Sequence, residues 1–483
     1  MKKAISVILA LVIAFSASLC VFAEGEKCDC DVTPVIYIGG FGCPIYSDPD
    51  GENEVRIFTP DTSLIVSSLP EIFLGVVGLL SGNSKMFAKW AMKAADKLIG
   101  DLRLTADGEI IDGVGIRPID MPEEDTHECE NYEFLGNARN DAETGEFRFD
   151  YDWRIDPFCN VQYLHEYVEC VKELTGHDKV SFACHSQGNT LMVTYLSAYG
   201  SEDIDKLCFL SPAYKGLSLV GYLFTGEISV EGKKDELTAF VDSMLGSDSA
   251  VTKIIGILNA THLTDFILKK LEKVLDEQYE NVYENFLVPV FGTMPGIWSF
   301  VPDEFYEDAK TAAFKGDSKY DKLIEKIDNY HYNVQSNVEE LLQTASDNGT
   351  GIIICAGYGI PTIPIVSAPA AESDFLIDTC YMGIGATCAP YGSTLGDGYS
   401  QKVPGEKNYI SPDNKIDAST CAFPEWTWFI MNQDHNTFTH GYLDLLNWAI
   451  TFDGQPTVFS DSRFPQFTVN SADGEKLVPV TAG

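Results

Sequence analysis

The feature that most constrains the fold is the pentad Cys184-His185-Ser186-Gln187-Gly188, which lies between two contrasting patterns. Residues 179–184 predict a strand, and residues 189–198 predict a helix. A serine at such a junction, with small residues two positions before and after it, is typical of a sharp turn that exposes the hydroxyl. Cys184 stands where glycine is usual. The pattern predicts that Ser186 is a nucleophile.

Strand and helix patterns alternate along much of the chain, and this order predicts a mostly parallel sheet covered on both faces. Further strand patterns lie at 34–38, 207–211 and Gly351–Cys355. From about 214 to 345 the chain instead holds long amphipathic helical segments, such as Asp265–Glu280 and Tyr320–Gln343. We therefore expect an α/β protein of the α/β-hydrolase type, with an inserted helical cap and a lid region.

The expected domain boundaries follow these changes of pattern. They are a signal peptide at 1–23, a first part of the core at 24–212 with a lid region at about 44–110, a cap at 213–348, and a second part of the core at 349–483. Within the lid region, residues 85–98 show helical periodicity. That helix is either packed against the core or part of a mobile lid that contacts lipid.

A serine hydroxyl needs a base and a carboxylate that orients the base. In the expected fold the chain order is serine, acid, histidine, and only His435 and His440 lie late enough. His435 stands in a polar loop after the apolar run 426–431, whereas His440 precedes a helical pattern. We expect His435 to be the base and His185 to pack beside the nucleophile.

The acid is less constrained by the residues themselves. Asp397 has a glycine on each side, which permits a tight, exposed loop. Asp374, Asp378 and Asp413 remain alternatives. The oxyanion formed on an ester would need two backbone N–H groups, and we expect these from Gln187 and from Phe41, beside Gly40, after the first strand.

The first residues have the features of a secretory signal. Lys2 and Lys3 precede an apolar run at 4–19, and residues 21–23 are small or apolar. A membrane span needs about 20 apolar residues, so we expect a cleaved signal peptide, bacterial export and a secreted protein without a transmembrane anchor.

The net charge disfavours some classes of binding partner, and the cysteine content bears on disulfide formation. The 483 residues carry a formal charge of −39, which disfavours nucleic acid and repels anionic membranes at long range. Of thirteen cysteines, Cys20 lies in the signal region and leaves an even number, which favours disulfides in an exported chain.

Metal and cofactor sites are not expected from the motifs. The pair Cys28-Asp-Cys30 suits neither a mutual disulfide nor a zinc knuckle, and the sequence contains no CxxC or HExxH. The acidic loop at 48–54 does not match a calcium-binding EF-hand. We expect no metal and no organic cofactor.

Several motifs together resemble the lecithin:cholesterol acyltransferase family, which includes lysosomal phospholipase and phospholipid:diacylglycerol acyltransferase. The most specific is Tyr151-Asp152-Trp153-Arg154, the family's YDWR motif in full. The others, in the family's order, are Pro34–Gly42, Gly113–Arg117, Ser186, Met294–Pro302, Tyr358–Thr362, Asp397 and His435. They extend from about residue 34 to residue 450. The Thr-Val after the acid, the methionine after the histidine and the lid cysteines of mammalian members are absent here.

The resemblance implies Asp397 as the acid, Gly40 and Trp153 beside the substrate, and a disulfide between Cys355 and Cys421. Cys380 and Cys388 could close a hairpin. We therefore predict a secreted lipase or phospholipase-like enzyme that forms an acyl-enzyme, with a lipid or another acyl ester as its substrate, met at a lipid interface. The alternatives are a lipid acyltransferase and a non-catalytic binding protein on the same scaffold.

Overall fold

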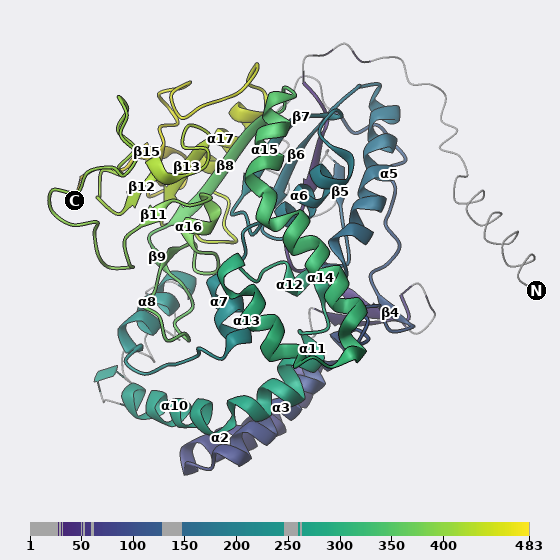
Figure 1. Cartoon of the computed structure of the whole chain (residues 1–483), viewed down its shortest axis with the longest axis vertical. Helices are drawn as coiled ribbons and strands as arrows, with labels where there is room; N and C mark the ends of the chain where they lie inside the picture. The colour runs from purple at the N-terminus through teal and green to yellow at the C-terminus, as the bar shows by residue number, and fades with distance from the viewer. Residues whose placement is uncertain are drawn as a thin grey trace, which may run out of the picture.

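The structure is a computed structural model that describes residues 28, 30, 32–49, 51, 54–58, 62–127, 147–245, 259–260 and 263–482. The predicted signal peptide at 1–23 lies outside these residues. A largely parallel sheet of eight strands, in the order β15-β14-β13-β8-β7-β6-β1-β5, forms the centre of the described chain (Figure 1). Only β14 and β15 pair antiparallel. The strands are β1 Val35–Ile38, β5 Phe147–Phe149, β6 Val180–His185, β7 Ile204–Leu210, β8 Gly351–Tyr358, β13 Thr427–Met431, β14 Phe467–Asn470 and β15 Leu477–Pro479.

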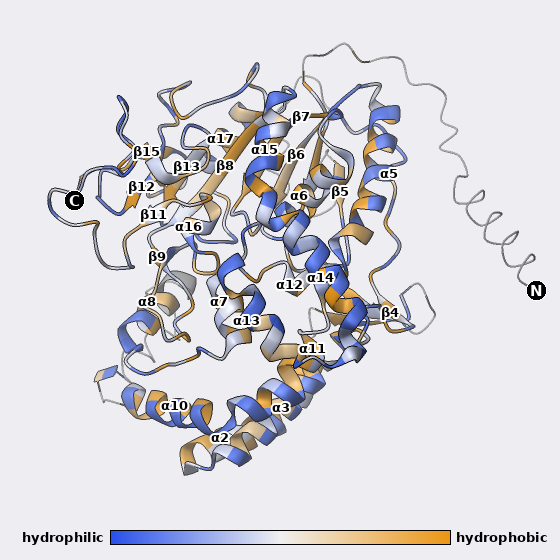
Figure 2. Cartoon of the chain, viewed as in Figure 1, coloured by the Kyte–Doolittle hydropathy of each residue, from blue (hydrophilic) through white to orange (hydrophobic). Residues whose placement is uncertain are grey.

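The central strands are mostly apolar, and Figure 2 shows this most clearly in β8. Every residue of β6 and of β8 is buried, as expected for parallel strands covered on both faces. Helices α5 (Pro157–Thr175), α6 (Gly188–Tyr199) and α15 (Val338–Asp347) pack against one face. Helix α17 (His440–Ile450) packs against the other. The predicted α/β class and the doubly covered parallel sheet are therefore confirmed.

The described part of the segment between β7 and β8 is mainly helical. Its helices are α7 Ser218–Thr225, α8 Lys234–Leu245, α10 Leu263–Val282, α11 Val288–Val290, α12 Pro295–Trp298, α13 Asp303–Phe314, α14 Asp321–Asn333 and α15. The helix predicted over Tyr320–Gln343 is interrupted between α14 and α15. There the buried Gln335 amide donates to the Ser299 carbonyl at 3.1 Å and its oxygen meets His331 at 2.8 Å. Turning Gln335 inward ends the first helix.

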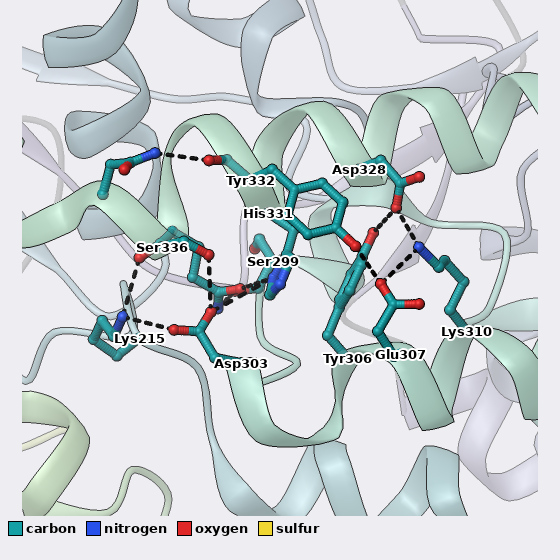
Figure 3. A network of polar contacts seen from close by, with 12 residues as sticks. Lys215, Ser299, Asp303, Tyr306, Glu307, Lys310, Asp328, His331, Tyr332 and Ser336 are labelled. Atoms are coloured by element: carbon teal, nitrogen blue, oxygen red, sulfur yellow. Dashed lines mark hydrogen bonds and ion pairs between the residues drawn. The ribbon is translucent and has the colours of Figure 1, made fainter.

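A polar network joins these helices to the core (Figure 3). Lys310 on α13 forms ion pairs with Glu307 at 3.0 Å and with Asp328 on α14 at 2.7 Å. Lys215, which follows β7, donates to Asp303 at 3.0 Å. These contacts join α13 to α14 and to the end of a central strand.

Helices α2 (Thr62–Ser81) and α3 (Ser84–Ile99) form a hairpin at the end of the molecule away from the sheet (Figure 1), and α10 packs against both. The helix predicted over 85–98 is thus confirmed. Among the described residues, one helical window, Leu64–Ser81, is long and apolar enough to cross a membrane, so this part of the chain holds no multi-span anchor.

Small sheets complete the fold. Strands β2 (Ile45–Ser47), β3 (Val55–Phe58) and β4 (Val114–Gly115) form one of them. The others are two-stranded, with β9 Ile360–Pro361 against β10 Glu372–Ser373, and β11 Thr387–Cys388 against β12 Ile416–Asp417; the short helix α16 is Thr379–Met382. Cys355, Cys421, Cys380 and Cys388 are thiols in the structure, so neither of the two suggested disulfides is formed.

Candidate active site

Ser186 lies at the carboxyl end of β6, in the tight turn that leads into α6. Its φ of 54° falls in the left-handed region, which is unfavourable for a residue with a side chain and needs support from neighbours. The Ser186 N–H donates to the Leu210 carbonyl at 3.1 Å, and the Ser186 carbonyl accepts from Asn189. A Cβ on Gly188 would lie 2.4 Å from the Ile38 carbonyl oxygen, so only glycine lets α6 approach β1 this closely. The turn predicted from the pentad is present.

His435 lies in the loop after β13, and the structure brings it to Ser186. Its Nε2 is 2.9 Å from the Ser186 Oγ, and its Nδ1 is 2.7 Å from Asp374 Oδ2. The loop starts at Asn432, whose φ is 58° and whose N–H donates to the Tyr358 carbonyl at 2.6 Å. The three side chains form one chain of hydrogen bonds at the carboxyl edge of the sheet.

The acid beside His435 is Asp374, not Asp397, which corrects the sequence prediction. Asp397 lies in an exposed turn whose flanking glycines have φ values of 99° and 75°. Those glycines serve that turn and do not carry the carboxylate to the histidine. Asp374 instead follows β10, the short strand that turns back along the end of β8.

Close packing seats Asp374 against β8. A Cβ on Gly357 would lie 2.8 Å from the Asp374 Cβ and 2.8 Å from the Gln433 carbonyl oxygen. The sequence contains this glycine, but its role depends on two segments that are distant along the chain. Asp374 was one of the sequence alternatives, and only the fold distinguishes it from the others.

The other sequence candidates have different roles. Asp378 accepts hydrogen bonds from the Ser218 N–H at 2.9 Å and hydroxyl at 2.8 Å, and so holds the start of α7. Burial raises the pKa of the Asp378 carboxyl. His440 is exposed at the first residue of α17. Asp413 is near Tyr358 and has no hydrogen bond to His435.

The hydrogen bonds orient the side chains of the site and, for a neutral His435, select the ring tautomer. Burial opposes ionisation of Asp374, but the nearby His435 and the N–H groups of Ile377 and Leu376 outweigh it, and the pKa of Asp374 is lowered. The ionised carboxylate accepts the Nδ1–H of His435. The Nε2 of His435 is therefore an acceptor, and the Ser186 hydroxyl donates to it. This is the arrangement in which a histidine can remove the proton from a serine.

His185 packs beside the triad, as predicted, and also makes a specific hydrogen bond. Its Nε2–H donates to the His435 carbonyl at 2.8 Å, and the two rings lie 4.7 Å apart. Burial, followed by the proximity of His435, lowers the pKa of His185 to about 3. His185 therefore stays neutral at ordinary pH and supports the backbone that carries His435.

The turn after β1 lies against the nucleophile. A Cβ on Gly40 would lie 2.5 Å from Ser186 Cβ and 3.0 Å from Oγ, so the backbone of this turn closely approaches the serine. Within the described residues, neither the Phe41 N–H nor the Gln187 N–H has a hydrogen-bond acceptor. Both are available to an oxyanion. A pocket of about 210 Å³ adjoins this turn and includes Gly40, Phe41 and Tyr151 in its wall.

Trp153 packs beneath the turn after β1. Its side chain is buried, its Nε1–H donates to the Cys43 carbonyl at 3.1 Å, and its ring lies 4.0 Å from that of Phe41. The Gln187 amide donates to the Trp153 carbonyl at 2.8 Å and to the Gly296 carbonyl at 3.2 Å. In this structure Trp153 positions the turn after β1, and its contact with substrate stays a prediction.

Two groups of potential metal ligands occur among the described residues, and both lie away from the triad. They are Cys28, Cys30 and His177, and His165, Glu169 and Asp203. The first includes Cys28 and Cys30, whose spacing in the sequence matches no zinc knuckle. Comparison with the models of known protein families and with curated proteins finds no match to this chain.

Proposed function

We propose that this protein is a serine hydrolase of the α/β-hydrolase fold that cleaves acyl esters through a covalent acyl-enzyme. The observation that carries the proposal is the hydrogen-bonded chain Ser186–His435–Asp374 at the turn after a central strand. The parallel sheet, the positive φ of Ser186 and the approach of Gly40 to the serine support the same conclusion.

The chemistry follows from the positions of the groups. The Ser186 Oγ attacks an ester carbonyl while His435 Nε2 takes the hydroxyl proton, and Asp374 stabilises the imidazolium. The N–H groups of Phe41 and Gln187 donate to the oxyanion. His435 then gives its proton to the leaving alcohol, which departs and leaves an ester on Ser186. Water or a second alcohol, deprotonated by His435, then attacks this ester and takes the acyl group, and Ser186 regains its proton from His435.

A lipid substrate is supported by the outer surface of α2. This helix exposes a set of large apolar side chains, namely Ile65, Val66, Leu69, Phe73, Val76 and Leu80. The adjacent α3 carries four exposed lysines at a spacing of four, namely Lys85, Lys89, Lys93 and Lys97. In a chain of charge −39, this hairpin combines apolar and basic groups, which suits docking on an anionic lipid surface. The resemblance to the lecithin:cholesterol acyltransferase family points to the same substrate class.

Water is the simplest acceptor of the acyl group, so we favour hydrolysis. Transfer to a lipid alcohol is the second candidate, because Ser186 and His435 are each only 5% exposed. A shielded acyl-enzyme reacts slowly with bulk water, which lets a bound alcohol compete.

Labelling with a fluorophosphonate probe tests the proposal. We expect the full chain to react with the probe, in the presence of phospholipid vesicles, at Ser186. Ser186→Ala should abolish labelling, whereas Ser393→Ala, which changes an exposed serine, should not. Labelling that persists in Ser186→Ala, or a wild-type protein that is never labelled, would contradict the proposal and favour a non-catalytic binding protein.

Product analysis then separates the two candidate reactions. The enzyme is incubated with phospholipid and neutral lipid, with and without a long-chain alcohol. Free fatty acid in both samples indicates hydrolysis, and a new ester that requires the alcohol indicates transfer.

A further inference from the structure

Two cysteines and two histidines meet at a place that the proposed reaction does not use. Cys28 and Cys30 come from the segment before β1, His127 from the segment that follows β4, and His177 from the turn between α5 and β6. All four side chains are partly buried. Three separate stretches of the chain therefore bring sulfur and imidazole groups together.

The distances from the Cys30 sulfur to the two histidine nitrogens fit ligands around one small ion, although His127 lies outside the group whose ligand atoms are all mutually close. The Sγ of Cys30 lies 3.4 Å from His127 Nε2 and 3.5 Å from His177 Nε2. The ligand atoms of Cys28, Cys30 and His177 all lie within 4.8 Å of one another. Zinc binds sulfur at about 2.3 Å and nitrogen at about 2.0–2.1 Å, so tetrahedral geometry separates a sulfur from a nitrogen ligand by about 3.5 Å. The two sulfur to nitrogen distances match that separation.

Ordinary hydrogen bonding explains this convergence less well. The Cys30 thiol has one proton, yet its Sγ also lies 3.2 Å from the Val32 carbonyl. It can donate to one of these three neighbours, and an imidazole could donate its Nε2–H to the sulfur, but S–H is a weak donor and sulfur a weak acceptor. The two imidazole rings stand nearly perpendicular, at 86° with centroids 5.0 Å apart, and both direct Nε2 at the same sulfur. Shared coordination accounts for that orientation.

The other group of potential ligands shows the contrast. Lys172 lies 2.9 Å from Glu169 and 2.7 Å from Asp203, so an ammonium group already balances both carboxylates. The His165 ring stacks on Tyr199 with centroids 4.1 Å apart. That group needs no metal to explain it.

We infer that Cys28, Cys30, His127 and His177 bind one divalent metal ion of borderline softness, with Zn²⁺ as the best fit. Two thiolates and two neutral imidazoles are a ligand set typical of zinc, and together they neutralise its charge. The protein fills all four positions of a tetrahedral site, which leaves none for a substrate or water. This describes a structural site.

The location in the fold supports a structural role. His177 lies just before β6, whereas Ser186 lies just after it. Because β6 has six residues at about 3.3 Å each, the two sites are about 20 Å apart, at opposite edges of the sheet. A metal here would tie the segments that carry Cys28, Cys30 and His127 to the start of a central strand. It would stabilise the fold without touching the triad.

Metal analysis of the untagged full chain tests the inference. Protein purified from zinc-supplemented culture, without chelators, should contain about one zinc per chain by elemental mass spectrometry. Cys30→Ser and His177→Gln should each reduce the zinc to background, and the matched control His165→Gln should keep it. Chelation should lower the melting temperature of the wild type by several degrees and leave that of His177→Gln unchanged.

A second measurement covers variants that fold poorly. Reduced, metal-free wild type titrated with Co²⁺ should develop the visible bands of tetrahedral cobalt and the thiolate charge-transfer band, saturating near one equivalent. Zn²⁺ should displace the cobalt. Wild type that binds neither ion after reduction would overturn the inference, as would variants that retain zinc at the wild-type level.

Discussion

The two edges of the central sheet contain different kinds of site. At the carboxyl edge, Ser186 follows its strand at once and sits in a strained turn, and His435 follows four residues after β13. At the amino edge, the proposed ligands Cys28, Cys30 and His177 precede β1 and β6 by three to seven residues, and His127 comes from a third segment. The same strands position both sites. Tight turns after parallel strands bring Ser186 and His435 together, whereas the group at the amino edge depends on segments that are far apart in the sequence.

The largest effect that would test this comparison is expected from Asp374→Asn. An amide in place of the carboxylate favours the wrong tautomer of His435, so we expect turnover to fall by about 10³- to 10⁴-fold. Rates are measured with a short-chain ester. The bound metal should be unchanged, because the substitution touches only the carboxyl edge.

Asp397→Asn is the matched control for that experiment, since it makes the same chemical change in an exposed turn. We expect wild-type turnover from it. If Asp397→Asn were inactive and Asp374→Asn active, the acid assigned from the structure would be wrong. If Asp374→Asn also lost its metal, the two edges would not be independent.

A smaller effect is expected at the α2 surface, which belongs to neither edge. Phe73 is 66% exposed, and Phe73→Asp combined with Leu80→Asp should weaken binding to anionic phospholipid vesicles by about tenfold. Activity on a soluble short-chain ester and metal content should both stay at the wild-type level. Vesicle co-sedimentation and ester hydrolysis are measured on the same preparation.

The control for that surface is Phe459→Asp, which places one of the two negative charges on another exposed aromatic residue. It should bind vesicles as the wild type does. Equal losses of activity on vesicles and on the soluble ester in the α2 variant would instead show that this helix stabilises the fold and does not contact lipid.

The carboxyl edge could be predicted from the sequence because its signals are local. The strand, the pentad around Ser186 and the helix are contiguous, and His435 follows the last apolar run that fits a central strand. The acid could not be chosen in this way. Asp374 reaches His435 only because Gly357 leaves room for it and because the chain reverses after β8. The glycines beside Asp397 indicated a turn, and a turn is what they form.

No local motif in the sequence indicated a metal site at the amino edge of the sheet. The spacing of Cys28 and Cys30 matches no familiar zinc motif, and His127 and His177 lie far along the chain from them and from each other. Only the parallel pairing of β1 with β6 brings Cys30 and His177 to the same edge. The net charge of −39 predicted repulsion from anionic membranes. That value describes the whole chain and does not indicate the row of four lysines on α3.

The smallest expected effect at the carboxyl edge is the pH dependence that His185 contributes to the free energy of unfolding. Its pKa is about 3 in the folded protein, against 6.5 for an unperturbed histidine, so the unfolded chain binds one more proton between these values. The stability that His185 contributes is therefore complete above pH 6.5 and decreases as the pH falls toward 3. The slope for one proton is at most about 1.4 kcal/mol per pH unit.

His185→Gln removes this titration while keeping a side-chain N–H that can donate to the His435 carbonyl. We expect the difference in unfolding free energy between wild type and His185→Gln to shift in favour of the variant from pH 6.5 to pH 5. His440→Gln, at an exposed histidine, should show no such shift. A pH-independent difference for His185→Gln would mean that His185 is protonated in the folded protein, and a charged ring there would weaken the support it gives to His435.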